Sequence, residues 1–287
     1  MKLSTEIGSV SNIVGREKAI ELVAKAGFSA FDLSMFDLIE YDRANKSASP
    51  GKTPLSGEDY RRYAQRLKRI GLDNGIVCNQ SHAPFPTYAK GVKDWILRAI
   101  ECTAIVGGKV CVVHPDNDSS AERNAEFFFE ILPFAKSCGV KIATENMWNW
   151  NDEKGCAAPA ACSSHEDFLK HILAVDDDYF GACLDIGHAE MFGDETSAVK
   201  IIETLKDRLI ALHIHDNDRR FDSHAIPFSM KIDFPPIAAA LKRNGYTGDF
   251  TLEADSFFKG YTESDVPSGM ARLYEACRKF YELYLNA

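Results

Sequence analysis

Short apolar segments alternate with longer segments of helical periodicity along the whole chain. The apolar segments, whose lengths and compositions predict strands, are residues 3–6, 28–33, 75–80, 110–114, 140–145, 182–185, 209–213 and 250–253. Helical patterns precede most of these segments, for example over 16–26 and 57–70 and from about residues 92 and 121. They end at glycines, the residue type that most often follows a helix: Gly27, Gly71, Gly107 and Gly139.

This alternation of helix and strand predicts a parallel sheet whose strands are joined by crossover helices. Eight such units in 287 residues fit a closed (β/α)8 TIM barrel, which takes about 250 residues. An open doubly wound sheet is the alternative, but no Gly-x-Gly-x-x-Gly opens the first helix and polar residues end nearly every strand. We therefore expect an α/β fold, with one TIM-barrel domain spanning residues 1–287.

Two connections are long, residues 37–56 and 148–164, and the second contains Trp148 and Trp150. Both follow predicted strands. In a barrel they would lie on the face formed by the carboxyl ends of the strands, as rims or lids over a pocket.

Composition narrows the class of protein. A net charge of −9 and a pI near 5.4 argue against a surface built throughout to bind phosphates, so nucleic acid is not an expected partner. No stretch approaches the roughly 18 apolar residues of a membrane span, and the start of the chain lacks the apolar core of a signal peptide. Several of the eight cysteines lie in apolar runs, as buried free thiols do, so we expect a reducing, cytoplasmic setting.

Acids and histidines end most of the predicted strands. Those that follow strands three to eight are His82, His114, Glu145, Asp185, His188, His213, His215, Asp222, His224 and Glu253. In a barrel these strand ends meet at one pocket, where unpaired charges would cost several kcal/mol each. A shared divalent cation removes that cost, and mixed imidazole and carboxylate ligands suit Mn²⁺, Zn²⁺, Co²⁺ or Fe²⁺ better than Ca²⁺.

Each position also has a structural interpretation. His82 precedes Ala-Pro and could be a turn residue, and Asp222 and His224 could be solvated loop groups. Glu145, Asp185 and Glu253 differ because each closes an apolar strand. Their occurrence on separate strands favours the metal interpretation. We expect Glu6 and Asp32, which end the first two strands, to cap helices rather than to bind substrate.

The ordered set of strand-end motifs resembles the xylose isomerase-like TIM-barrel superfamily. That superfamily comprises sugar and sugar phosphate isomerases and epimerases, and it also includes zinc-dependent apurinic endonucleases. The matching segments are Ser81-His82-Ala83-Pro84, Val113-His114-Pro115, Thr144-Glu145-Asn146, residues 184–188, residues 212–218, Asp222-Ser223-His224 and Leu252-Glu253.

The resemblance to the ketose 3-epimerases of this superfamily implies one metal held by Glu145, Asp185, His213 and Glu253. The seventh-strand ligand stays open between His213 and His215, because His-x-x-acid spacing fits both and side chains repeat every two residues. The resemblance also implies that His188 and Arg219 or Arg220 bind substrate. The segment 227–231 departs from the Gly-x-Gly that the family carries after strand seven.

The implied activity is isomerisation or epimerisation of a sugar, sugar phosphate or cyclitol through a metal-stabilised enediolate. Glu145 and Glu253 would act as the acid/base pair, while Trp148 and Phe85 are candidates for apolar walls.

The apurinic endonucleases, with three zinc ions, are the alternative. Candidates for all their additional ligands are present: His82, His114, His188, Asp222 and His224. A sugar or cyclitol lyase is a third option. We expect one ion per chain, with room for up to three, and a small carbohydrate as the partner. Phe280, Tyr281 and Tyr284 near the end of the chain either form a homo-oligomer surface or pack on the barrel.

Overall fold

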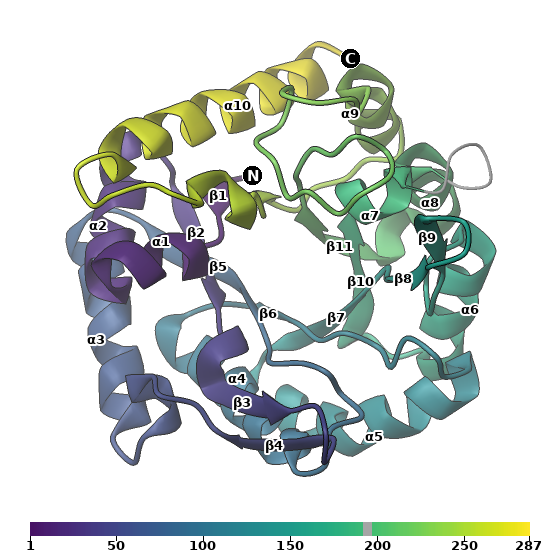
Figure 1. The fold of residues 1–287 in the computed structure, drawn as a ribbon, viewed down its shortest axis with the longest axis horizontal. Coiled ribbons are helices and arrows are strands. Elements are labelled where there is room, and N and C mark those ends of the chain that lie inside the picture. The colour runs from purple at the N-terminus through teal and green to yellow at the C-terminus, as the bar shows by residue number, and fades with distance from the viewer. Residues whose placement is uncertain (192–196) are drawn as a thin grey trace.

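The computed structural model describes residues 1–191 and 197–287 and shows a barrel of parallel strands inside a ring of helices (Figure 1). The barrel strands are β1 (Leu3–Thr5), β2 (Ala30–Ser34), β5 (Val77–His82), β6 (Val110–Val112), β7 (Lys141–Glu145), β10 (Phe180–Asp185), β11 (Leu209–His213) and β12 (Phe250–Leu252). Each predicted strand corresponds to one of these, with ends that coincide or differ by at most two residues. The α/β prediction of a TIM barrel is confirmed.

The barrel closes through two short seams. Six strands form one continuous sheet in the order β11-β10-β7-β6-β5-β2, while β1 and β12 pair with each other. Single parallel bridges, Glu6 to Asp32 and Ile214 to Leu252, join that pair to the two edges of the six-stranded sheet. The register of β10 and β11 places Asp185 directly opposite His213.

The outer ring holds the crossover helices. These are α1 (Gly8–Val14), α2 (Arg16–Ala26), α3 (Tyr60–Asp73), α4 (Val92–Val106), α5 (Ala121–Cys138), α6 (His165–Val175), α7 (Ile186–Glu190), α8 (Ala198–Leu205), α9 (Phe234–Arg243) and α10 (Val266–Asn286). Among these described helices, none has the length and apolarity that crossing a bilayer requires. The last helix, α10, packs against α9 and α2 and so completes the ring (Figure 1).

Two local predictions are settled by packing. Gly71 does not end α3: the helix continues to Asp73, and Gly71 is buried where an added Cβ would lie 3.1 Å from the carbonyl oxygen of Ile76. Phe280 and Tyr284 are buried and their rings contact Phe250, so these two side chains pack on the barrel.

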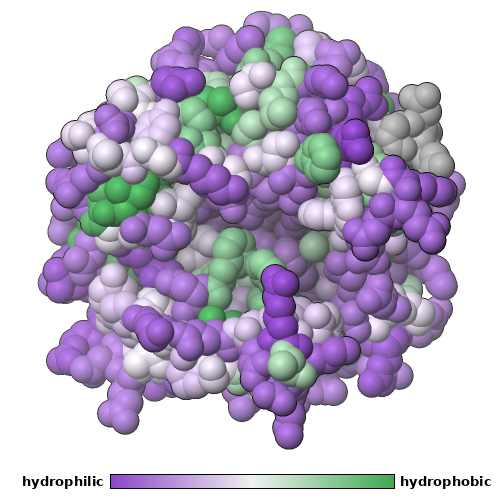
Figure 2. Space-filling model, in the orientation of Figure 1, coloured by the Kyte–Doolittle hydropathy of each residue, from purple (hydrophilic) through white to green (hydrophobic). Residues whose placement is uncertain are grey.

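Both long connections fold into antiparallel hairpins rather than irregular loops. The first forms β3 (Ile39–Asp42) and β4 (Ser47–Pro50), and the second forms β8 (Trp148–Asn151) and β9 (Cys156–Pro159). They stand at the carboxyl end of the barrel, with β3 and β4 below the central space in the view of Figure 1 and β8 and β9 to its right. Figure 2 shows a hollow in the middle of this face, bordered by hydrophobic side chains.

A small apolar layer lies inside the barrel, apart from the main core between strands and helices. It consists of Val112, Ala143, Cys183 and Ala211. Each stands two residues before a residue of the predicted site, namely His114, Glu145, Asp185 and His213, and therefore points to the same side of the sheet. This layer is the floor on which the polar residues stand.

Candidate active site

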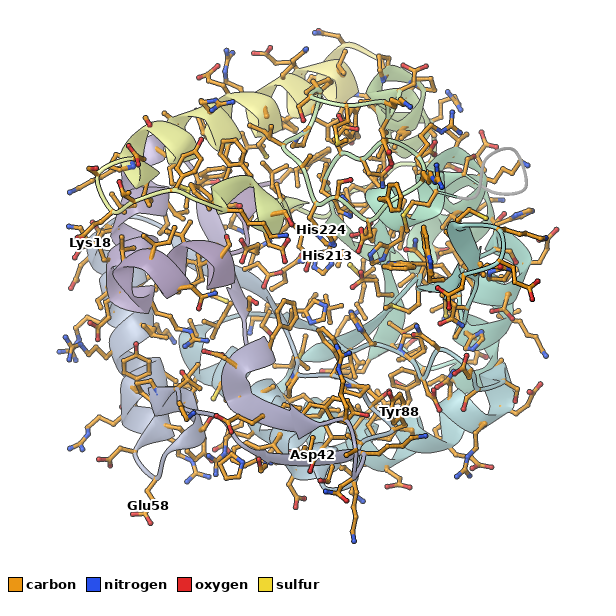
Figure 3. The ribbon with its side chains drawn as sticks, viewed as in Figure 1. Lys18, Asp42, Glu58, Tyr88, His213 and His224 are labelled. Carbon is orange, nitrogen blue, oxygen red and sulfur yellow. The ribbon has the colours of Figure 1, made fainter. Side chains whose placement is uncertain are left out.

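A cavity of about 270 Å³ opens at the carboxyl end of the barrel. This volume is near the lower end of the roughly 300–1,000 Å³ that is usual for small-molecule sites. Aromatic and acidic side chains and imidazoles make up most of its lining, among them Phe85, His114, Glu145, Trp148, His188, Asp222, His224 and Glu253. Figure 3 shows side chains from separate strands pointing into this central space, with His213 and His224 labelled.

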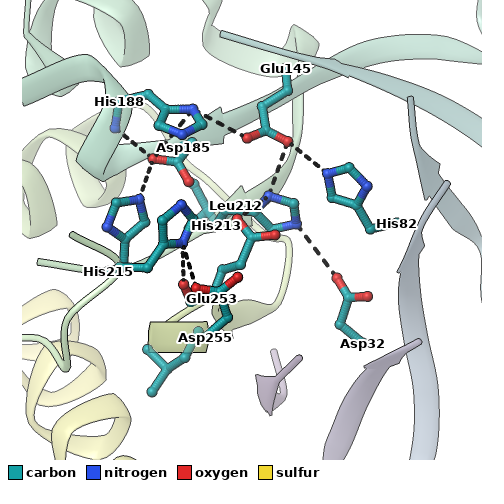
Figure 4. A network of polar contacts seen from close by, with 12 residues as sticks. Asp32, His82, Glu145, Asp185, His188, Leu212, His213, His215, Glu253 and Asp255 are labelled. Carbon is teal, nitrogen blue, oxygen red and sulfur yellow. Dashed lines mark hydrogen bonds and ion pairs between the residues drawn. The ribbon is translucent and has the colours of Figure 1, made fainter. Parts of the chain in front are cut away.

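Glu145, Asp185, His213 and Glu253 form the centre of the site. Each offers one ligand atom, and these four atoms lie within 4.8 Å of one another. The Nδ1 atom of His213 is 3.1 Å from a carboxylate oxygen of Glu145 and 3.2 Å from one of Glu253 (Figure 4). All four side chains are buried. Residues separated by more than 100 positions in sequence thus meet at one point because they end neighbouring strands.

The chemistry of this group fits a divalent cation. Within the described parts of the chain, both carboxylate oxygens of Glu145, Oδ2 of Asp185 and both ring nitrogens of His213 are buried without a hydrogen bond of good geometry. Buried polar atoms without partners are costly, so natural proteins rarely leave several together. Three carboxylates and one imidazole are a ligand set that Mn²⁺, Co²⁺, Fe²⁺ and Zn²⁺ accept.

His215 belongs to a second group, with His188, Asp222 and His224, whose ligand atoms also lie within 4.8 Å of one another. Its Nε2 atom is 3.1 Å from Oδ1 of Asp185, and its ring stacks on that of His224 with centroids 3.9 Å apart. His213 and His215 therefore face the same side of β11 and its continuation but serve different groups. His213 is the one beside Glu145 and Glu253.

His82 and His114 form a third group with Glu145. Their Nε2 atoms lie 3.4 and 3.5 Å from the same carboxylate oxygen, Oε2 of Glu145. Glu145 thus belongs to both the first and the third group, and Asp185 contacts the first and the second. All ten strand-end residues expected from the sequence gather in one continuous network.

Backbone carbonyls orient three of the imidazoles. The Nδ1 atoms of His82, His188 and His224 donate to the carbonyl oxygens of Ala83, Asn146 and Glu253, at 2.9, 2.9 and 2.7 Å. With Nδ1 donating to a carbonyl in each, Nε2 faces a carboxylate, which is Glu145 for His82 and Asp222 for His188 and His224. This arrangement of a backbone acceptor behind the ring is typical of metal-binding histidines.

The charges within the site compensate one another. Burial by itself would raise the pKa of Glu145, but the charge of His213 and contacts from His114, His213 and His82 outweigh it and hold that pKa well below its usual range. Burial likewise opposes ionisation of His188, yet Asp185 and Asp222 raise its pKa to about 10. The carboxylates thus favour the cationic form of His188, whereas burial and the neighbouring His82 lower the pKa of His114.

Local structure explains why these side chains are held firmly. Asn146 bridges the ends of β7 and β10, since its side chain accepts from Asp185 N at 2.8 Å and donates to Asp185 O at 2.9 Å. Asp185 then caps α7 by accepting from the backbone nitrogen of His188 at 2.7 Å. Gly187 leaves room for the ring of His215, because an added Cβ would lie 1.9 Å from Cε1 of that ring.

The candidate substrate residues divide into two sets. Trp148 and Phe85 line the cavity: the Trp148 ring meets that of His188 edge-on, and the Phe85 ring stacks on His114 at 4.8 Å. Arg219 does not line it. Its Nε atom donates to the carbonyl oxygen of Glu190 at 3.4 Å, and its Nη2 atom is 3.6 Å from the Glu190 carboxylate.

Sequence reasoning misjudged Asp32 and overlooked Asp255. Asp32 caps no helix; it is buried in the barrel, with Oδ2 3.5 Å from Nε2 of His213. Glu6, in contrast, does accept from the backbone nitrogen of Ser9 at the start of α1, at 3.0 Å. Asp255 lines the cavity and lies 3.6 Å from Nδ1 of His224. Its place two residues after Glu253 was the signal that could have identified it.

The chain matches the model of the family described as xylose isomerase-like TIM barrel over residues 20–275. Among curated proteins it is similar to the uncharacterized protein MJ1311 of Methanocaldococcus jannaschii, at 28% identity over 169 residues, which are 56% of this chain and 55% of that one. It is also similar to the uncharacterized protein y4fM of Sinorhizobium fredii, at 27% identity over 54% of this chain and 50% of that one. The match therefore spans about half the length of these relatives.

Solved structures share the fold over the whole chain. A D-tagatose 3-epimerase-like protein superimposes with a TM-score of 0.73 at 21% identity, covering 100% of this chain and 99% of that one. An L-ribulose 3-epimerase gives 0.69 at 17% identity, covering 99% and 94%. A 3-keto-D-glucoside 4-epimerase from E. coli gives 0.68 at 16% identity, covering 98% and 99%. With the family model matching most of its length, this chain belongs to the xylose isomerase-like TIM-barrel family.

Proposed function

We propose that the protein is a divalent-metal-dependent isomerase or epimerase of a sugar, sugar phosphate or cyclitol. One observation carries the proposal: Glu145, Asp185, His213 and Glu253 converge within 4.8 Å beside a cavity of small-molecule size that has apolar and hydrogen-bonding walls. The epimerases with the same fold support it, although at identities where fold alone is shared.

A divalent ion bound by these four residues would polarise a substrate carbonyl and so lower the pKa of the neighbouring C–H bond. Glu145 comes from the end of β7 and Glu253 from the end of β12, and each faces the same nitrogen of His213. One of them removes the proton from the carbon next to the carbonyl, leaving the substrate as an enediolate. The other returns a proton to the opposite face in epimerisation, or to the adjacent carbon in isomerisation.

Other side chains would position the substrate. His188 is fixed by its hydrogen bond to the carbonyl of Asn146 and lines the cavity, where it can bond to a hydroxyl group. Trp148 and Phe85 both line the cavity and offer flat apolar surfaces to the carbon face of a sugar. This combination of a few polar groups with aromatic walls suits a carbohydrate.

The proposal is tested by following substrate protons. The protein, reconstituted with Mn²⁺ or Co²⁺, is incubated in deuterated buffer with a panel of ketoses, aldoses, their terminal phosphates and cyclitols, and deuterium incorporation next to the carbonyl is measured by NMR. Glu253→Gln should reduce exchange at least a hundredfold, because general acid/base groups typically contribute factors of 10² to 10⁴. Glu275→Gln, an exposed acid paired with Arg278 on α10, is the matched control. Failure of every compound to exchange would refute the proposal.

Metal-assisted hydrolysis of a phosphodiester is the second candidate. The observation in its favour is that the second and third groups, around His215 and around His82, adjoin the first through Asp185 and Glu145. A site for up to three zinc ions suits the apurinic endonuclease interpretation. Three zinc ions per chain together with nicking of abasic duplex DNA would favour hydrolysis; one ion and no nicking would favour the isomerase. A lyase would be identified by a product that has lost a β-substituent.

A further inference from the structure

A second, smaller cavity lies beside the first at the mouth of the barrel. The two cavities share Phe36 and Asp255 in their walls. The polar lining of the second includes Glu6, Ser9, Asn12, Arg16, Asp37 and Asp255. It lies where the ends of β1 and β2 meet α1 and α2, next to the Glu6–Asp32 seam. A ligand that reaches past Phe36 and Asp255 from the first cavity would enter it.

Glu6 is a buried acid without a matching cation. Its side chain is 5% exposed, and its carboxylate accepts from the backbone nitrogen of Ser9 at 3.0 Å and from the Ser9 hydroxyl. Burial is the main cause that raises its pKa to about 7, and the nearby charges of Asp255 and Glu253 act in the same direction. Within residues 1–191 and 197–287, no lysine or arginine forms an ion pair with it. A carboxylate in these surroundings favours hydroxyl donors and disfavours further negative charge.

Arg16 is the cation in this lining, and most of its hydrogen bonds are made within the protein. One terminal nitrogen donates to Thr53 Oγ1 at 2.6 Å, and the other donates to the carbonyl of Ser34 and to the carboxylate of Asp37 at 2.5 Å. Of the five N–H bonds of the guanidinium group, one on Nη1 and the one on Nε remain, and Nε is buried and lacks a partner among the described residues. Arg16 can therefore still donate to a ligand, but its charge is balanced by Asp37.

We propose that the second cavity is a hydroxyl-binding subsite for the end of the substrate remote from the reacting carbons, and that this end is not phosphorylated. The proposal rests on the proposed sugar isomerase or epimerase function. A hydroxyl group can donate to Glu6 or Asp255 and accept from Nε of Arg16, so one polyol end satisfies both kinds of group. A terminal phosphate would instead face the carboxylates of Glu6 and Asp255, since the charges of Arg16 and Asp37 balance each other.

The loop after β11, where many barrels bind phosphate, is also occupied. The backbone nitrogens of Asn217, Met230 and Ile232 donate to the carboxylate of Asp216, at 2.8, 2.7 and 3.0 Å. The two arginines of this loop point elsewhere, because Arg219 pairs with Glu190 and Arg220 donates to the carbonyl of Gly155. These amides and guanidinium groups are thus not available to a phosphate.

Binding rather than turnover tests the subsite. Isothermal titration calorimetry on the protein reconstituted with Mn²⁺ would compare each free ketose and aldose of a panel with its own terminal phosphate, for example D-tagatose with D-tagatose 6-phosphate. The tightest-binding free sugar should bind at least tenfold more tightly than its phosphate. Equal or tighter binding of the phosphate would overturn the proposal, as would a panel in which no free sugar binds.

Glu6→Gln tests the residue. The substitution should weaken binding of the free sugar about ten- to a hundredfold, as expected for the loss of a hydrogen bond to a charged acceptor. It should also reduce the ratio between the affinities for the free sugar and for its phosphate. Glu21→Gln, an exposed acid of α2 paired with Lys18, should leave both affinities unchanged. An unchanged free-sugar affinity in a folded Glu6→Gln protein would overturn the assignment. If only phosphorylated sugars exchange their protons with solvent, the subsite is refuted and the isomerase proposal stands. If free sugars bind but do not exchange, the isomerase proposal is refuted and the subsite stands.

Discussion

Asp32 stands behind His213, with its Oδ2 atom 3.5 Å from Nε2 of the imidazole, on the side of the ring opposite Glu145 and Glu253 (Figure 4). The same oxygen accepts from the side-chain nitrogen of Gln80 at 3.0 Å, which holds the carboxylate in place. An acid at this position favours the tautomer with the proton on Nε2 and leaves the lone pair of Nδ1 for a cation shared with Glu145 and Glu253. Acids in this relation to a histidine orient the ring and raise its affinity for metal.

Asp32→Asn is therefore expected to weaken metal binding. The loss of such a supporting acid typically costs ten- to a hundredfold in affinity. Competition with a chromogenic chelator gives the dissociation constant for Mn²⁺ or Zn²⁺ directly, without an activity assay. Asp73→Asn, at an exposed position near the end of α3, serves as the control. An Asp32→Asn protein that binds metal like the unaltered chain would show that Asp32 has no such role.

Gly187→Ala separates the first metal group from the second. The new methyl group would overlap the ring of His215, whereas Glu145, His213 and Glu253 lie on other strands. If one ion is held by the first group, elemental analysis should still find it in this variant. If the protein binds several ions through His215 and its neighbours, the variant should lose at least one. A loss of all metal would instead show that the ring of His215 supports the first group.

Removal of metal should lower thermal stability, because the cation binds the folded chain and leaves buried carboxylates behind when it is removed. At a concentration one hundred times its dissociation constant, an ion contributes about 2.7 kcal/mol. Differential scanning fluorimetry after treatment with EDTA, and again after Mn²⁺ or Zn²⁺ is restored, measures this. The response should disappear in Asp185→Ala. A melting temperature that does not depend on the ion would contradict the metal interpretation of the first group.

Glu6→Gln should stabilise the protein at alkaline pH. Because the pKa of Glu6 is about 7 in the folded protein and near its usual value of 4.5 in the unfolded chain, the folded state holds this proton to higher pH. Its contribution to stability is fully present below pH 4.5 and is lost as the pH rises through 7. Glutamine does not ionise and has no such loss. The free energy of unfolding of the variant, relative to that of the unaltered protein, should therefore increase by up to about 3 kcal/mol between pH 4.5 and pH 9.

Urea unfolding of both proteins at the two pH values checks this difference. If the difference in free energy of unfolding between the two proteins is the same at both pH values, Glu6 ionises normally. Greater stability combined with weaker sugar binding would be the expected trade-off at a binding residue.

The barrel was predictable because strand and helix patterns are local and repeat eight times. The local predictions that were wrong concern positions whose structure depends on tertiary contacts. Gly71 continues a helix because close packing near Phe31 and Ile76 requires a residue without a side chain there, which spacing alone cannot reveal. The segment Trp148–Asn151 alternates aromatic and polar residues, but only over four positions, and its hairpin was not foreseen.

For the site, strand-end acids and histidines could be placed together because the fold dictates where strands end. The loop residues could not, because the direction of Arg219 depends on its left-handed backbone, with φ of 66°, and on Glu190 from a different segment. Asp32 was misjudged for a related reason. Its interior position at the end of β2 depends on the register with β5, which shifts between Phe31 and Asp32.

The apolar layer beneath the site determines how deep a ligand can reach. Its side chains are short: Val112, Ala143, Cys183 and Ala211. A larger or smaller residue at any of these positions would raise or lower the floor beneath Glu145, Asp185 and His213. Each of these short residues is separated from a functional one by a single position along its strand. The side-chain volume of Val112, Ala143 and Ala211 therefore limits the size of the molecule that fits above them, whereas the thiol of Cys183 also lies within 4.8 Å of the ligand atoms of Glu145 and His213.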